Sequence, residues 1–134
     1  MLRHILFLST IVLLGATLAA CTSNPYDEFI PLNDYEQLDE YDETGELYLV
    51  YVYLEECPAC QDLLDDLLAF NDAHGDTYPI LADDTTAEGT RPGSVSGVPT
   101  MFLMRSGEIV EGPVAGVEPI IELLDDVESG IYEN

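Results

Sequence analysis

Two cysteines separated by two residues are the side chains of this sequence whose type and spacing could carry out chemistry. They are Cys57 and Cys60, in the stretch Cys57-Pro58-Ala59-Cys60. A thiolate can attack a disulfide of another molecule, and a second thiol nearby can then displace the product from the mixed disulfide. The spacing therefore predicts a site of thiol-disulfide exchange, whose two cysteines can also form a disulfide with each other.

The flanking residues predict a strand before the cysteines and a helix that starts at them. Residues 47–54 form an unbroken run of tyrosine, leucine and valine, which is typical of a buried strand. Pro58 falls at the first helical position, where its missing N–H costs nothing. The free N–H groups of a helix start stabilise a thiolate, so we expect Cys57 to be the attacking sulfur. Apolar residues follow Cys60 at three- and four-residue steps, so we expect Cys60 to face the core and resolve the mixed disulfide.

A zinc site and an inert structural disulfide are the other interpretations of this cysteine pair. Zinc would need two further ligands. His4 lies in a segment that we expect to be removed, His74 falls near the end of the predicted helix, and Cys21 is accounted for below. We therefore expect no metal and no cofactor, and we favour redox chemistry over the structural disulfide.

From about residue 47 to residue 127 the chain resembles the thioredoxin superfamily. The strand, the Cys-x-x-Cys pair and the helix are the first common feature. The second is Gly97-Val98-Pro99-Thr100, which leads into a strand-like segment at 101–104. A turn at 105–108, a short strand and a final amphipathic helix complete the resemblance. In that family the proline of such a segment is cis and lies beside the cysteines, so the resemblance implies this role for Pro99.

The resemblance implies an α/β fold, a thioredoxin-like three-layer sandwich with a central mixed four-stranded sheet flanked by helices. We expect a short helix over 34–44, a second strand over 78–82 parallel to the first, and a last helix opening at Pro119. The polar segment 83–97 indicates that the middle helix of the family is shortened or replaced by a loop. Tyr51 and Glu56 stand where thioredoxins usually have a buried Asp and a Trp.

The N-terminal residues predict export and lipid attachment. A short basic start is followed by 16 apolar residues at 5–20, too few to span a bilayer comfortably, so we expect residues 1–20 to be a signal peptide. The run ends in Leu18-Ala19-Ala20-Cys21, which resembles the bacterial lipobox and implies lipidation of Cys21. An ordinary cleavable signal and an uncleaved anchor stay open. We expect residues 21–33 to be a lipid-anchored tether and residues 34–134 to be the thioredoxin-like domain.

The charge of the chain excludes some partners. Residues 21–134 carry all 27 acidic residues, no lysine and two arginines, Arg91 and Arg105, so their formal charge is −25 with His neutral. We therefore expect no binding to nucleic acid, which relies on basic side chains, and no help from the surface in binding anionic lipids. The acidity indicates either a generally solvated surface or adaptation to high salt, where counterions screen the repulsion.

Taken together, these features predict a monomeric, membrane-anchored thiol-disulfide oxidoreductase on the extracytoplasmic side, with protein thiols and disulfides as its partners. A pair of this kind belongs outside the reducing cytoplasm. Two other classes stay open. The domain could be a redox-inert binding or accessory module, or, with less support, a protein that delivers a soft metal ion such as Cu(I) through Cys57 and Cys60.

Overall fold

The computed structural model describes residues 23–134. The signal peptide and Cys21 lie outside the described residues, so those assignments remain predictions. Among the described residues, no helix is both long enough and apolar enough to cross a membrane.

The described part of the chain contains short helices, two longer helices and five strands. In order, the elements are the 3₁₀-helix η1 (Pro25–Glu28), β1 (Ile30–Pro31), the 3₁₀-helix η2 (Tyr35–Gln37), α1 (Leu38–Asp42), β2 (Tyr48–Val52), α2 (Pro58–His74), β3 (Ile80–Asp83), β4 (Thr100–Arg105), β5 (Glu108–Ala115) and α3 (Val117–Glu128).

The strands form one mixed sheet in the order β1-β3-β2-β4-β5. β1, β3 and β2 run parallel, and β4 and β5 are antiparallel to their neighbours. β2 is central: Val50 pairs with Leu81 of β3 on one side and with Phe102 of β4 on the other. The parallel pairing of β2 with β3 and the α/β class are confirmed, while the sheet has five strands where four were expected.

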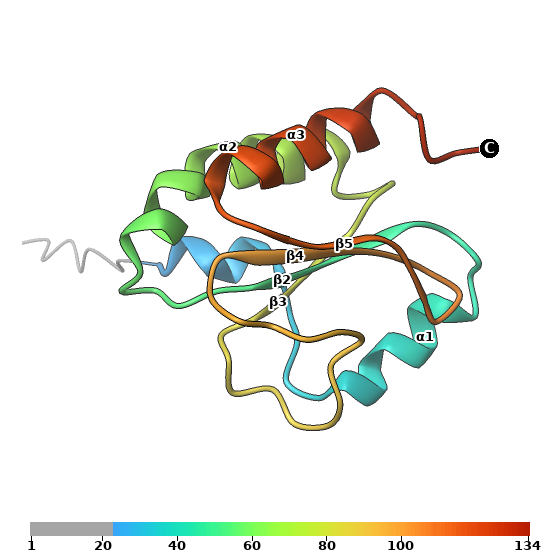
Figure 1. The fold of residues 1–134 in the computed structure, drawn as a ribbon, viewed down its shortest axis with the longest axis horizontal. Helices are drawn as coiled ribbons and strands as arrows, with labels where there is room; N and C mark the ends of the chain where they lie inside the picture. The colour runs from blue at the N-terminus through green and yellow to red at the C-terminus, as the bar shows by residue number, and fades with distance from the viewer. Residues whose placement is uncertain (1–22) are drawn as a thin grey trace, which may run out of the picture.

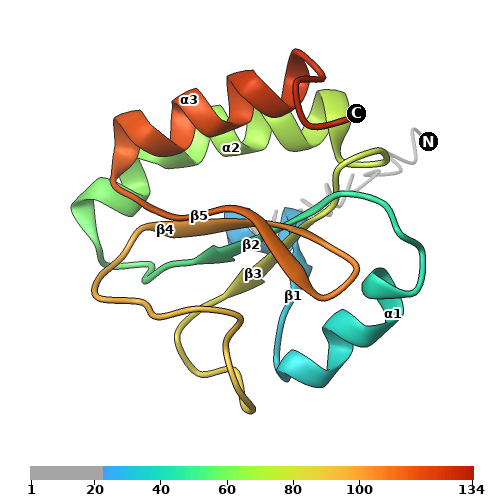
Figure 2. The same ribbon diagram turned by 45° about the vertical axis from the view of Figure 1, so that its right-hand side comes forward.

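Helices and a long loop cover the two faces of the sheet, which gives three layers (Figures 1 and 2). α2 and α3 lie side by side on one face, and α1 lies on the other. Successive residues of β2 point to opposite faces, and all five are buried. This burial on both sides explains why residues 48–52 are an unbroken apolar run rather than an alternating one.

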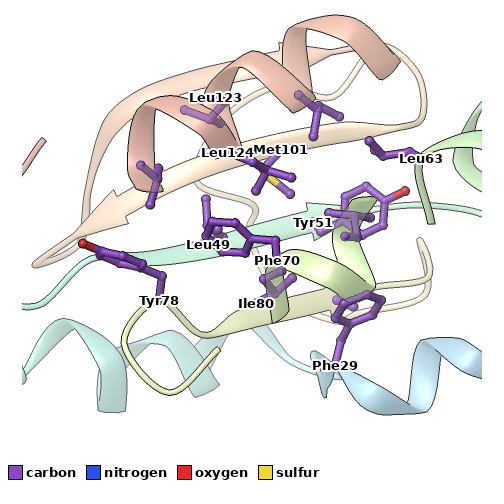
Figure 3. Close-up of a cluster of buried hydrophobic side chains, with 14 of the residues drawn as sticks. Phe29, Leu49, Tyr51, Leu63, Phe70, Tyr78, Ile80, Met101, Leu123 and Leu124 are labelled. Atoms are coloured by element: carbon purple, nitrogen blue, oxygen red, sulfur yellow. The ribbon is translucent and has the colours of Figure 1, made fainter. Parts of the chain in front are cut away.

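The core between the sheet and α2/α3 is the larger of two. Figure 3 shows how side chains from the strands and both helices meet there. Leu49 and Tyr51 of β2, Leu63 of α2 and Leu123 of α3 all belong to it. The start of α2 is therefore packed firmly against the carboxyl end of β2.

The first described residues pack on the domain, whereas we expected a tether as far as residue 33. Tyr26, Phe29 and Leu32 are 7%, 2% and 2% exposed. The two-residue strand β1 pairs with β3, and the Leu32 N–H donates to the Ala82 carbonyl over 2.9 Å. Burial of these apolar side chains and satisfaction of backbone groups hold the segment from Pro25 onward on the sheet. The domain therefore includes residues from Pro25, not only from residue 34.

Residues 84–99 form a loop where the family has a helix, as the polar composition indicated. Asp83, fully buried at the end of β3, anchors the start of this loop. Its Oδ2 accepts hydrogen bonds from Arg91 Nε and Nη2 over 3.1 and 3.0 Å and from the Tyr35 hydroxyl over 2.6 Å. Its Oδ1 accepts from the Ala87 N–H over 3.2 Å. One buried carboxylate thus joins β3, η2 and the loop.

The middle of the loop, at Gly93, passes close to the Phe102 side chain of β4. A side chain at Gly93 would bring its Cβ within 2.9 Å of the Phe102 ring, so the close approach requires glycine there. The loop then runs through Val98 and Pro99 into β4.

The hairpin of β4 and β5 and the helix α3 close the domain, as the resemblance implied. The pairing of β4 with β5 contains register shifts, and the Gly112–Pro113 peptide bond within β5 is cis. α3 begins at Val117, two residues before Pro119, at which we expected it to open.

Candidate active site

Cys57 caps the N-terminus of α2. Its backbone is extended, with φ −73° and ψ 118°, and Pro58 occupies the first turn of the helix. The Cys57 Sγ accepts a hydrogen bond from the backbone N–H of Cys60 over 3.3 Å. The sulfur thus lies at the N-terminal end of the helix with a backbone N–H directed at it. Cys57 is partly exposed, so another molecule can reach its sulfur.

Cys60 lies one turn inside the helix and is fully buried. Burial raises the pKa of the Cys60 thiol to about 11, and the neighbouring Cys57 thiol also raises it. The backbone of Leu54 and the Tyr51 hydroxyl act in the opposite direction and lower the pKa. Both cysteines are thiols in this structure and are not bonded to each other. The two sulfurs therefore differ in the way that thiol exchange requires, one accessible and one shielded.

Pro99 lies against the same site, at the end of the loop that leads into β4. The Val98–Pro99 peptide bond is cis, as the resemblance implied, and Pro99 is buried. The Cys57 thiol donates a long hydrogen bond, 3.8 Å, to the Val98 carbonyl. The Pro99 carbonyl in turn accepts from the Gly116 N–H over 3.0 Å, which connects the loop to the start of α3. The structure thus brings together Cys57, Cys60 and Pro99, the three candidate residues that lie in its described part.

The surface beside Cys57 is acidic and partly apolar. Leu54, Glu55, Glu56 and Asp84 line a shallow depression there. Leu54 is 44% exposed, one of the few large apolar side chains left open to solvent among the described residues. A molecule that approaches Cys57 therefore meets carboxylates and a leucine.

A stack of three tyrosines beneath the cysteines was not anticipated from the sequence. The rings of Tyr51 and Tyr53 are stacked with centroids 5.5 Å apart, and those of Tyr53 and Tyr26 with centroids 4.1 Å apart. Tyr51 and Tyr53 are two residues apart in the chain, so an extended backbone puts their side chains on one face; that spacing could have revealed half of the stack. The contribution of Tyr26 could not be seen, because its place depends on the packing of the N-terminal segment.

Within residues 23–134, no three His, Cys, Asp or Glu side chains gather in a way that could hold a metal ion. Cys21, the predicted lipid attachment site, lies outside the described residues.

Comparison with known proteins identifies the fold. No protein-family model matches the chain, and no curated protein matches it significantly. Among solved structures, it is similar to mitochondrial thioredoxin 3 from Saccharomyces cerevisiae, with 17% identity and a TM-score of 0.60 over 83% of this chain and 100% of that one. It is similar to thioredoxin from Fasciola hepatica, with 17% identity and a TM-score of 0.63 over 75% and 98% of the two chains.

A third solved structure is nearer in sequence. It is a mutant thioredoxin from Halobacterium salinarum NRC-1, with 27% identity and a TM-score of 0.57 over 81% of this chain and 94% of that one. The mixed sheet, the helices on both of its faces and the cis proline opposite the Cys-x-x-Cys pair agree with these likenesses. The chain therefore has the fold of the thioredoxin superfamily.

Proposed function

We propose that this protein is a thiol-disulfide oxidoreductase that uses Cys57 and Cys60. The observation that carries the proposal is the pairing of an accessible sulfur at the N-terminus of α2 with a fully buried one a turn later. The contact of 3.3 Å between the Cys60 N–H and Cys57 Sγ orients the first sulfur toward the helix start. A disulfide with a merely structural role gains nothing from a sulfur that is left partly exposed at a helix N-terminus.

The reaction consists of two exchanges. In the reductive direction the Cys57 thiolate attacks one sulfur of a substrate disulfide. A Cys57–substrate bond forms, the substrate disulfide breaks, and its other sulfur leaves as a thiolate. Cys60 then loses its proton to water and attacks the Cys57 sulfur, which forms the Cys57–Cys60 disulfide and releases the second substrate thiolate. The substrate gains two electrons and the protein loses two. The same steps in reverse oxidise a dithiol.

The backbone at Val98 and Pro99 is proposed to form the edge along which an extended substrate segment lies. The Val98 carbonyl faces the Cys57 sulfur, so a chain bonded to that sulfur would run beside it. We accordingly propose protein thiols and disulfides as the substrates. The acidic depression formed by Leu54, Glu55, Glu56 and Asp84 borders the same site.

We further propose that the enzyme is held at a membrane, on its extracytoplasmic side, by lipid on Cys21. The sequence supports this through the apolar run at 5–20 and its ending in Leu18-Ala19-Ala20-Cys21. Incorporation of labelled palmitate into the full chain, with Cys21→Ser as the test variant and Cys60→Ser as the control, checks the assignment. Equal labelling of Cys21→Ser and the control would contradict it.

The exchange chemistry is tested with a peptide disulfide as the substrate. The reduced full chain in detergent should release peptide thiol, and Cys57→Ser should not. Cys60→Ser should accumulate a mixed disulfide at Cys57, which peptide mass spectrometry locates. If the unaltered chain is no faster than Cys57→Ser, the enzyme proposal is refuted, and a binding module becomes the better account of the fold.

A further inference from the structure

The hydroxyl of Tyr51 is a buried polar group that the two-step exchange does not use. Tyr51 is 0% exposed, and its hydroxyl has no hydrogen-bond partner among the described residues. A buried hydroxyl without a hydrogen-bond partner destabilises the folded state, so its presence in a folded protein requires an explanation. Tyr51 lies in β2, six residues before Cys57 in the chain.

The fully buried thiol of Cys60 belongs to the same core cluster as Tyr51. In Figure 3 the Tyr51 hydroxyl points away from Leu49 and Phe70, toward the side where Leu63 of the first turns of α2 lies. Burial is the largest influence on the pKa of Cys60 and raises it, and the Tyr51 hydroxyl acts in the opposite direction. The unpaired hydroxyl of Tyr51 and the resolving thiol of Cys60 are thus fully buried in one cluster, and the hydroxyl points toward the side of the sheet where α2 begins.

The ionisation state of Tyr51 decides what it can do. Burial, followed by the charge that Cys60 would carry, raises the pKa of Tyr51 far above the usual range of a tyrosine. The phenol therefore keeps its proton under all conditions in which the enzyme works. It can donate a hydrogen bond to a Cys60 thiolate, but it cannot accept the proton that Cys60 loses.

Tyr51 is the hydroxyl that acts on the Cys60 thiol, and the other titratable groups nearby are Cys57, Tyr26 and Glu55. Cys57 faces Cys60 from the helix start and raises its pKa. Tyr26 faces it from the N-terminal segment; its hydroxyl is also buried and unpaired among the described residues, and its own pKa is raised to about 12, mainly by burial. Glu55 also raises the pKa of Tyr26, after burial and the two cysteines.

We propose that Tyr51 is a positioning residue for the resolving step: its hydroxyl donates a hydrogen bond to the Cys60 sulfur when that sulfur is ionised, and so sets the rate of attack on the mixed disulfide. This inference rests on the proposed exchange function. In the step, the Cys60 proton passes to water, the Cys60–Cys57 bond forms, and the Cys57–substrate bond breaks with release of a thiolate. Tyr51 keeps its proton throughout.

The test follows the two exchanges separately in the full chain with Cys21→Ser, in which Cys57 and Cys60 are the only thiols. One equivalent of dithiobis(nitrobenzoate) is added to the reduced protein, and release of the coloured thionitrobenzoate is followed by stopped flow from mildly acidic to alkaline pH. The first phase reports attack by Cys57. The second phase reports resolution by Cys60.

Tyr51→Phe should leave the first phase unchanged and alter the second. Loss of one hydrogen bond to a charged sulfur lowers the thiolate fraction of Cys60 about tenfold. The remaining thiolate is about threefold more nucleophilic, so the second phase slows about threefold at neutral pH. The pH at which this phase reaches its plateau should rise by about one unit. Tyr53→Phe, which removes a hydroxyl from the neighbouring ring of the same stack, is the matched control and should change neither quantity.

The outcomes separate this inference from the proposed function. Absence of a second phase in the chain with Tyr51 intact would refute the exchange function itself. A normal second phase with an identical pH profile in Tyr51→Phe would refute the role of Tyr51 alone. Should Tyr51→Phe fail to fold, Tyr51→Met removes the same hydroxyl with a smaller apolar side chain, and an unchanged profile there would refute the role equally.

Discussion

Removal of Arg91 should destabilise the domain through Asp83. In Arg91→Met, the fully buried Asp83 loses two of its four hydrogen bonds and its only counter-ion among the described residues. Breaking a wholly buried ion pair costs about 3–5 kcal/mol. The Arg91 side chain is 33% exposed, so water can partly replace it, and we expect a loss of about 2 kcal/mol.

The assay is reversible unfolding by heat and by urea. For a domain of roughly 110 residues, a loss of about 2 kcal/mol lowers the melting temperature by about 8 °C. Arg105→Met is the matched control: it removes the same charge, but Arg105 donates to the Tyr132 carbonyl near the chain end and leaves no buried carboxylate behind. We expect the control to lose less than about 1 kcal/mol.

A double-mutant cycle with Asp83→Asn isolates the pair. Equal losses of unfolding free energy in Arg91→Met and Arg105→Met, or a coupling free energy of zero between Asp83 and Arg91, would mean that overall charge repulsion explains the loss. Either result would refute the stabilising role of the buried ion pair. Unfolding in molar salt distinguishes these two explanations further. Salt screens repulsion between surface charges, but it restores little stability to a domain with an unpaired buried carboxylate.

Three other predictions concern charge, pH and packing. Because residues 21–134 carry a formal charge of −25, the melting temperature should rise between low and molar salt; a flat series would contradict adaptation to salt. Burial raises the pKa of Cys60 to about 11, above its value in the unfolded chain, so its contribution to stability is complete below about pH 9 and is lost as the pH rises to about 11. The reduced chain should therefore lose stability more steeply than Cys60→Ser across that window in urea titrations, and equal slopes would count against the raised pKa. Leu67→Ala, at a fully buried position of α2, should cost about 2–5 kcal/mol in urea unfolding, and a loss below about 1 kcal/mol would mean that α2 is loosely packed.

The parts of the fold that could be predicted are those with strong local signals. The run at 48–52 is apolar on both faces, and Pro58 marks the helix start, so β2, α2 and the position of Cys57 followed from the sequence. The loop at 84–99 followed from its polar composition. Pro99 could be placed beside the cysteines only through resemblance, since nothing in its immediate sequence shows which distant segment it contacts.

The parts that could not be predicted depend on contacts between distant residues. β1 is two residues long, and Ile30-Pro31 has no periodicity; it becomes a strand because β3 pairs with it. The hydrogen bonds of Asp83 join three separate segments, and an aspartate in a short apolar strand does not indicate its partners. Tyr51 could be assigned to a buried strand, but the direction of its hydroxyl depends on the packing of α2.

The two outermost strands determine whether another chain can extend the sheet. An unpaired strand with an uninterrupted row of donors and acceptors is a template for association between chains. β1 offers only two residues, and Pro31 has no N–H to donate. β5 contains Pro113, carries Glu108 and Glu111, and is broken by shifts in its register. Both edges of the sheet therefore lack an uninterrupted row of backbone donors and acceptors, which disfavours edge-to-edge pairing even at salt concentrations that screen the charges of Glu108 and Glu111.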